Sequence, residues 1–138
     1  MDIRVLAYNE GKFIISKDLT NESIKDKQVM INIAPVLKYR EENNVIGAQL
    51  NVDYSVDGKT ILFLGVVVSI YVENIKDILE NPDNNKKKQD LKPIWEIALG
   101  IARGVLAEKT QNTPLKNYLL PLVDIDDFAT FTIFVKEE

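Results

Sequence analysis

Carboxylates, hydroxyls and amines are the side chains on which any acid–base or nucleophilic chemistry of this chain would have to rest. The sequence contains no histidine and no cysteine, so it lacks the commonest general base, the commonest metal ligand and every thiol. Its densest carboxylate cluster is Asp124-x-Asp126-Asp127. That cluster lacks the glycine and the distal glutamate of a calcium loop, and a solvated turn or helix cap explains it. We therefore predict no catalytic residue and no metal site.

A second polar set follows a predicted strand. From Ile46 to Val56 the even positions are apolar or small, whereas the odd positions are polar or glycine. A period of two places the odd set, which includes Asn51, Asp53 and Ser55, on a solvent-facing side of a sheet, where we expect surface residues rather than an active site. The glycines form neither a phosphate-binding loop nor a dinucleotide fingerprint, so no cofactor is predicted.

The strand that follows is apolar on both faces. Asp57-Gly58 favours a tight type I′ hairpin, and the returning segment from Thr60 to Val72 has one apolar face made by alternate residues: Leu62, Leu64, Val66, Val68, Ile70 and Val72. The opposite face is also largely apolar: Ile61, Phe63, Val67 and Tyr71. Either a loop or helix of the same chain covers this second face, or the face contacts another chain. We predict that these four residues bind another polypeptide chain, which we call the client.

A long helix is predicted from Leu91 to Lys109, with Asp90 as its cap and Pro93 in its first turn. Its apolar residues span an arc of roughly 200°, whereas a helix on one sheet needs a stripe only slightly wider than about 100°. We therefore expect a second cover, supplied by another subunit, with an oligomer interface at Ile97, Gly100, Ile101 and Gly104. The two glycines would allow close approach of a neighbouring helix; packing against the sheet of the same chain explains them equally well.

The other predicted elements complete an α+β domain that spans residues 1–138. Two short strands, Ile3–Tyr8 and Phe13–Ile15, flank a turn, and a strand from Val29 to Tyr39 has Pro35 at an edge or a bulge. The remaining expectations are a polar loop over 81–88, a short helix or extended crossing over Leu115–Pro121, and a last strand or extended tail within Ala129–Val135.

Composition restricts the partners. Lysines and arginines are scattered and the net charge is −4, so nucleic acid is not an expected partner. The apolar stretch from Ile61 to Val72 is too short for a membrane helix, which needs about 20 residues. Met1-Asp2-Ile3-Arg4 lacks the layout of a signal peptide, so a cytoplasmic location is predicted.

The element order resembles that of the SecB-like export chaperones. The most specific stretch is Ile94–Phe128. It carries motifs similar to those of the family: Ala102-Arg103 within the helix, Thr113-Pro114-Leu115, Leu119-Leu120-Pro121-Leu122-Val123, and Asp127-Phe128. The resemblance implies a four-stranded antiparallel sheet with a long and a second short helix on one side, assembled as a dimer of dimers. It also implies a holdase that binds unfolded polypeptides in apolar grooves without a cofactor.

Three alternatives remain open beside export. Members of the family usually end in a polar acidic tail that engages the translocase motor ATPase, whereas this sequence ends at Lys136-Glu137-Glu138 after an apolar segment; contact with the motor is therefore uncertain. Some relatives are dedicated chaperones of antitoxins, and this chain fits that role equally. A structural oligomer without a client is the second alternative. The third is a protein of hot-dog or cystatin-like build that binds a small apolar ligand.

Overall fold

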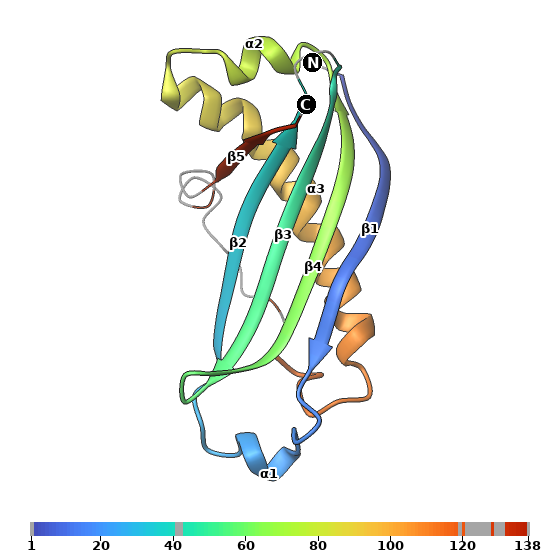
Figure 1. The fold of residues 1–138 in the computed structure, drawn as a ribbon, viewed down its shortest axis with the longest axis vertical. Coiled ribbons are helices and arrows are strands. Elements are labelled where there is room, and N and C mark those ends of the chain that lie inside the picture. The colour runs from blue at the N-terminus through green and yellow to red at the C-terminus, as the bar shows by residue number, and fades with distance from the viewer. Residues whose placement is uncertain (1, 41–42, 119, 121–127, 129–131, 138) are drawn as a thin grey trace.

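A computed structural model describes residues 2–40, 43–118, 120, 128 and 132–137. A five-stranded sheet stands in front of a long helix (Figure 1). The strand order is β1 (Ile3–Ile15), β4 (Lys59–Val72), β3 (Val45–Val56), β2 (Met30–Tyr39) and β5 (Ile133–Lys136). The first four strands pair antiparallel, and β5 pairs parallel with β2. The α+β class is confirmed. The prediction of a four-stranded sheet is wrong, because the C-terminal segment adds a fifth strand.

The β3–β4 hairpin forms as predicted. Asp57 and Gly58 have φ angles of 52° and 78°, the two left-handed conformations that a type I′ turn requires. The turn sets the register, and the even-numbered residues of β3 all point into the core, none more than 7 % exposed. The odd-numbered residues of β3 lie on the opposite face and are only partly buried.

β1 is one continuous strand of 13 residues, so the predicted turn between two shorter strands is wrong. The pairing with β4 shifts register between Val5 and Ala7 and again between Glu10 and Phe13. Such bulges absorb extra residues without ending the strand. Gly11 lies at the second shift, where a Cβ atom would come within 3.3 Å of the Gly65 carbonyl oxygen. The turn-prone residues therefore form an irregular stretch of strand.

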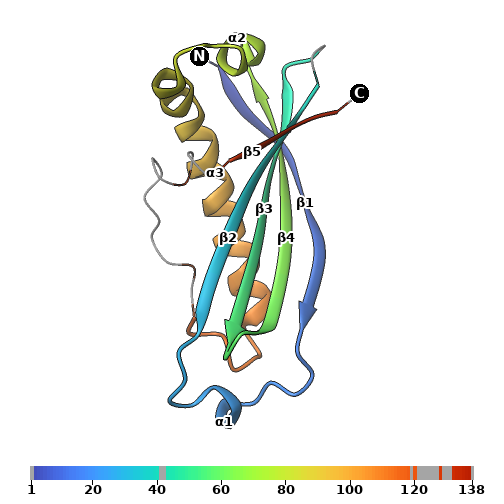
Figure 2. The same ribbon diagram turned by 60° about the vertical axis from the view of Figure 1, so that its left-hand side comes forward.

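The long helix α3 (Asn84–Thr110) begins earlier than predicted. The Asp83 carboxylate accepts hydrogen bonds from the backbone N–H groups of Asn85 and Lys86, at 3.0 and 3.3 Å. This cap stabilises a helix start within the segment expected to be a polar loop, so Asp90 and Pro93 lie inside the helix. Two shorter helices, α1 (Asn21–Ile24) and α2 (Ile75–Leu79), lie beyond opposite ends of the sheet (Figure 2).

The core lies between α3 and the facing side of β3 and β4. α3 buries eight apolar residues on one side: Leu91, Ile94, Trp95, Ala98, Leu99, Ala102, Val105 and Leu106. The Trp95 ring also meets Phe128 edge-on, with ring centroids 5.4 Å apart. The predicted crossing at Leu115–Pro121 starts with turns through residue 117, and residues 119 and 121 lie outside the described part. α3 is thus covered by the sheet and, at Trp95, by the C-terminal part of its own chain.

Candidate functional site

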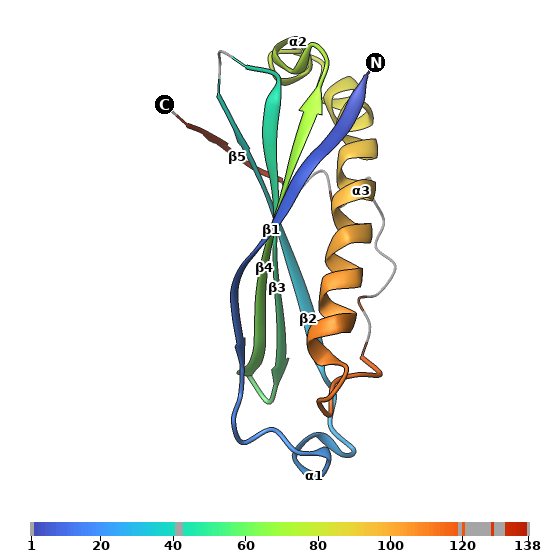
Figure 3. The same cartoon turned by 90° about the vertical axis from the view of Figure 1, so that its right-hand side faces the viewer.

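One face of the sheet is open. Figure 3 shows α3 along one side of the strands, with α1 and α2 beyond their ends. We call the other side the outer face; along its centre run the half-buried side chains of Phe63, Val67 and Tyr71 from β4. No described helix lies across this face (Figures 1 and 3). Three of the four residues predicted to bind a client therefore share one surface.

Ile61 does not share it. Its side chain is only 8 % exposed, and it lines a hollow of about 320 Å³ together with Leu19 and Ile24. This hollow lies between the lower end of the sheet and α1. Ile61 is thus accessible to a large partner only if the α1 segment moves.

The apolar stripe of the outer face is narrow. Phe63 stands between Ile14 of β1 and Asp53 of β3, and Val67 stands between Asn9 and Gln49. The guanidinium of Arg4 covers the ring of Tyr71 at 4.5 Å. Each of the three side chains thus has at least one polar neighbour and is only partly buried.

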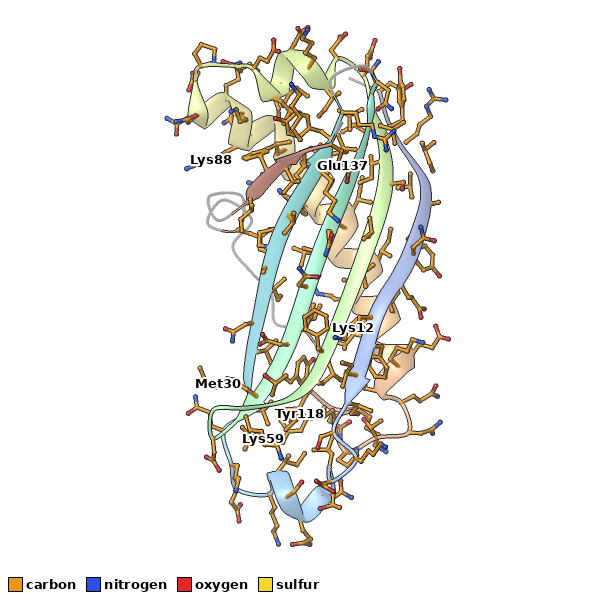
Figure 4. All side chains as sticks on the ribbon, viewed as in Figure 1. Lys12, Met30, Lys59, Lys88, Tyr118 and Glu137 are labelled. Carbon is orange, nitrogen blue, oxygen red and sulfur yellow. The ribbon has the colours of Figure 1, made fainter. Side chains whose placement is uncertain are left out.

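A hollow of about 350 Å³ lies at the upper end of the outer face. Val67 and Gly47 contribute to its apolar part; a Cβ atom on Gly47 would lie 3.5 Å from a methyl group of Val67. Lys38, Arg40 and Glu137 also line it, and the Arg40 guanidinium lies 3.7 Å from the Glu137 carboxylate. Figure 4 shows Glu137 at this end of the sheet. A hollow of this kind can seat one apolar side chain beside polar or charged groups.

Most of the exposed large apolar residues of the described part lie on the edge strands. On β1, four large apolar side chains are about half exposed: Val5 at 46 %, Leu6 at 54 %, Tyr8 at 52 % and Ile14 at 50 %. Because β1 is the terminal strand in the sheet order, its outer backbone edge pairs with no strand of the described part. Sequence reasoning missed these residues: the apolar pattern was visible, but nothing in it identified which strand would lie at the edge.

The predicted oligomer residues lie on the flank of α3. Ile97 and Ile101 are half-buried, whereas Gly100 and Gly104 are exposed. A Cβ atom built on either glycine would meet nothing within 4 Å. Close packing against the chain's own sheet therefore does not explain the two glycines. Phe128 of the same chain covers Trp95, and Ile97 and Ile101 pack partly against the core, so the described residues supply part of the second cover expected from another subunit.

Two polar contacts hold the elements around the site. Lys109 at the end of α3 lies 2.8 Å from the Glu10 carboxylate on β1, and this hydrogen bond and charge raise the pKa of Lys109. The Tyr54 hydroxyl donates to the Tyr118 carbonyl oxygen, and burial raises the pKa of Tyr54 to about 12. The first contact joins β1 to α3, and the second joins β3 to the segment that follows α3. Both therefore have a structural role.

Metal-binding and membrane-spanning features were sought in the described part of the chain. Within it, no three His, Cys, Asp or Glu residues are grouped so as to hold a metal ion. The Asp124-x-Asp126-Asp127 cluster lies outside the described residues, so its prediction is untested. None of the described helices has the length and apolar character needed to cross a bilayer.

Comparisons with known proteins give a weak likeness to a solved structure. No family model matches the sequence, and no curated protein matches it. Among solved structures, the chain is similar to the Mycobacterium tuberculosis Rv1957 SecB-like chaperone in complex with a ChAD peptide from the Rv1956 HigA1 antitoxin. The TM-score is 0.48 at 10 % identity, over 89 % of this chain and 88 % of that chain. A likeness of this size assigns no family.

Proposed function

We propose that this protein is a holdase, which binds unfolded or partly folded polypeptides through exposed apolar side chains and a free strand edge. The observation that carries the proposal is β1, a 13-residue edge strand with four large apolar side chains about half exposed. Proteins usually protect such an edge, because it invites pairing with other chains. An extended polypeptide can add main-chain hydrogen bonds there, while its apolar side chains gain roughly 25 cal/mol per Å² buried.

The outer face supplies a second contact area in this proposal. Phe63 and Val67 offer apolar contacts, and the hollow beside Val67 seats a single side chain. Tyr71 takes part if the Arg4 guanidinium moves off its ring. Binding of this kind needs no nucleotide, metal or covalent step. The client is recognised by its exposed apolar segments rather than by a specific sequence.

Subunits associate, in the same proposal, through the flank of α3 at Ile97, Gly100, Ile101 and Gly104. The half-buried isoleucines supply apolar area, and the exposed glycines permit a neighbouring helix to approach closely. Exported precursors and antitoxins are both possible clients of such an oligomer, and the translocase motor is a possible further partner. Identification of proteins co-purified with the native chain separates these clients.

Aggregation suppression with a matched pair of variants tests the proposal. Leu6→Asp removes an apolar side chain from the β1 edge, and Asn9→Asp introduces the same charge at an exposed polar position of the same strand. Both sites are exposed, so the free energy of unfolding should change by no more than about 0.5 kcal/mol. We expect Leu6→Asp to suppress aggregation of a denatured test protein at least several-fold less well than Asn9→Asp, measured by light scattering.

The other results contradict the proposal in distinct ways. If the unmodified chain suppresses no aggregation, the holdase proposal is wrong and a structural oligomer without a client remains. If acyl ligands raise the melting temperature strongly, the protein binds a small apolar ligand instead, because ligands stabilise the folded state to which they bind. If the two variants behave alike, binding does not depend on the β1 edge.

A further inference from the structure

The C-terminal strand β5 is weakly held for a strand that completes a sheet. It has four residues, all exposed, and three of them are large and apolar: Ile133 at 58 %, Phe134 at 40 % and Val135 at 39 % exposed. It pairs parallel with β2, through Val36 to Tyr39. Parallel pairing is slightly weaker per residue than antiparallel pairing and usually occurs where both faces are covered. β5 therefore belongs to the least stable part of the sheet.

Several contacts of the described residues fix its position. The backbone N–H of Glu137 donates to the Tyr39 carbonyl oxygen at 2.7 Å, and the Glu137 carboxylate lies 3.7 Å from Arg40. The Lys87 ammonium of α3 lies 5.5 Å from the centre of the Phe134 ring. Exposed ion pairs and cation–π contacts each contribute little, so the backbone ladder provides most of the attachment.

β5 covers only part of the β2 edge. β2 runs from Met30 to Tyr39, and the described part of β5 pairs with its last four residues. The first part of this edge, from Met30 to Pro35, pairs with no described strand on that side, and Met30 is 51 % exposed. A longer strand in the place of β5 can therefore pair with β2 as far as Met30. Pro35 interrupts the ladder at one position, because it has no N–H.

We propose that β5 occupies a client-binding edge of β2, and that an extended apolar segment of an unfolded polypeptide displaces it from this edge. The sequence of β5 indicates which client segments this edge binds. Its β-branched and aromatic residues, Ile133-Phe134-Val135, pair parallel with β2 and place an aromatic ring beside Lys87. A longer client segment gains over β5 by pairing with the upstream half of β2 as well. The inference rests on the proposed holdase function. It adds a second client-binding edge, which β5 regulates by covering it and which lies opposite β1 in the sheet order.

A reversible lock of β5 tests the displacement. Val36 and Ile133 are directly paired, and neighbouring strands lie about 4.8 Å apart, within the Cα separation that a disulfide spans. Because the sequence contains no cysteine, the Val36→Cys/Ile133→Cys variant has a single disulfide to form. The probe is a fluorescein-labelled peptide with the sequence of residues 132–137, and its binding is measured by anisotropy in the oxidised and reduced forms. We expect the oxidised form to bind the probe at least about tenfold more weakly.

A second variant loosens β5 instead. Glu137→Pro removes the N–H that bonds to Tyr39 together with the carboxylate beside Arg40. Loss of one backbone hydrogen bond should strengthen probe binding about fivefold. Glu137→Gln is the matched comparison: it retains the N–H and loses only the charge beside Arg40, so probe binding should strengthen clearly less than in Glu137→Pro.

Parallel measurements with reduced, carboxymethylated α-lactalbumin separate this inference from the holdase proposal. If the oxidised and reduced forms bind this unfolded protein and the peptide equally, β5 is not displaced and the inference is wrong, while the holdase proposal stands. If neither form nor the unmodified chain binds the unfolded protein, the holdase proposal fails, and the inference with it. If Glu137→Pro associates with itself as the concentration rises, shown by native mass, the freed edge takes a second copy of the chain, which overturns the assignment of a client segment.

Discussion

Phe63 shows how a sheet can carry an apolar residue on its open face. Gly65 lies two residues away, where a Cβ atom would be 3.9 Å from the Phe63 ring, so the ring has room to lie close to its own strand. Ile14 across the β1–β4 ladder adds an aromatic–aliphatic cross-strand pair. The side chain is therefore stabilised by its neighbours while part of its surface stays in water.

Substitution of Phe63 by Asp should weaken the binding of an unfolded test protein about tenfold. Burial of an aromatic ring against a client contributes more than about 1 kcal/mol to the binding free energy. The cost to folding should be about 1 kcal/mol, the size of a cross-strand pair. Ser55→Asp places the same charge on the same face, on β3 and outside the hollow beside Val67, and serves as the control. Binding is measured by fluorescence anisotropy and stability by urea unfolding. Global unfolding of the Phe63→Asp variant alone would mean that this face belongs to the core.

Tyr54 predicts a pH dependence of stability. Its folded-state pKa is about 12, above the value of about 10 expected when the chain is unfolded. The folded state thus holds the proton more tightly, and the stability from this group is complete below pH 10 and is lost as the pH rises toward 12. Tyr54→Phe should lower the free energy of unfolding by about 1 kcal/mol at pH 8, through the lost hydrogen bond to Tyr118.

At pH 11 that difference should shrink by about 1 kcal/mol, because the proton affinities of the folded and unfolded states differ about hundredfold and about tenfold of this, worth roughly 1.4 kcal/mol, has been lost by that pH. Urea unfolding of both proteins at the two pH values measures the change. The two proteins differ only at this hydroxyl, so the comparison isolates Tyr54. A difference that is constant between pH 8 and pH 11 would contradict the assigned role of burial.

At the scale of elements, the position of a strand in the sheet decides whether one of its backbone edges is available for pairing. β3 and β4 lie inside the sheet and use both backbone edges, whereas β1 and β5 are terminal. β1 is long, interrupted by bulges and fixed to α3 by the Lys109–Glu10 contact; β5 is short and exposed. In our proposal the two edges therefore have different tasks: β1 stays in place, whereas β5 is displaced from the β2 edge.

The flank of α3 gives a prediction at the same scale. Gly100 and Gly104 lie in an exposed helix interior, where alanine is more stable than glycine by up to about 1 kcal/mol per position. The Gly100→Ala/Gly104→Ala variant should therefore unfold at higher urea concentration. If a second subunit packs against these glycines, the same variant should associate more weakly, which native mass over a concentration series measures. A more stable variant with an unchanged oligomer would exclude close helix packing at this flank.

The molecule as a whole consists of one sheet with a covered and an open face. α3 buries its widest apolar surface on β3 and β4, and the chain returns so that Phe128 meets Trp95 and β5 meets β2. Stability and binding surface are thereby separated: the covered face provides the core, and the open face and the two edges keep apolar side chains in contact with water. This arrangement suits a protein that must remain folded while it offers apolar contacts.

Local patterns in the sequence predicted the elements that depend on local physics. The alternation from Ile46 to Val56 and the Asp57-Gly58 turn predicted the central hairpin, because period and turn conformation are properties of neighbouring residues. The apolar arc predicted a helix that buries more than one narrow stripe, and its start was misplaced because Asp83 rather than Asp90 caps it. The face that carries Phe63, Val67 and Tyr71 also followed from period two alone.

Only the tertiary structure decided the order of the strands and, with it, the exposed edges. Nothing local in Ile3–Ile15 states that this segment will be terminal, or that Ile133–Lys136 will pair with β2 rather than extend into solvent. Likewise, the burial of Ile61 depends on a segment more than 30 residues away, around Ile24. Contacts between distant segments are set by the packing of the whole chain, so the sequence determined which residues are apolar, and the fold determined which of them meet water.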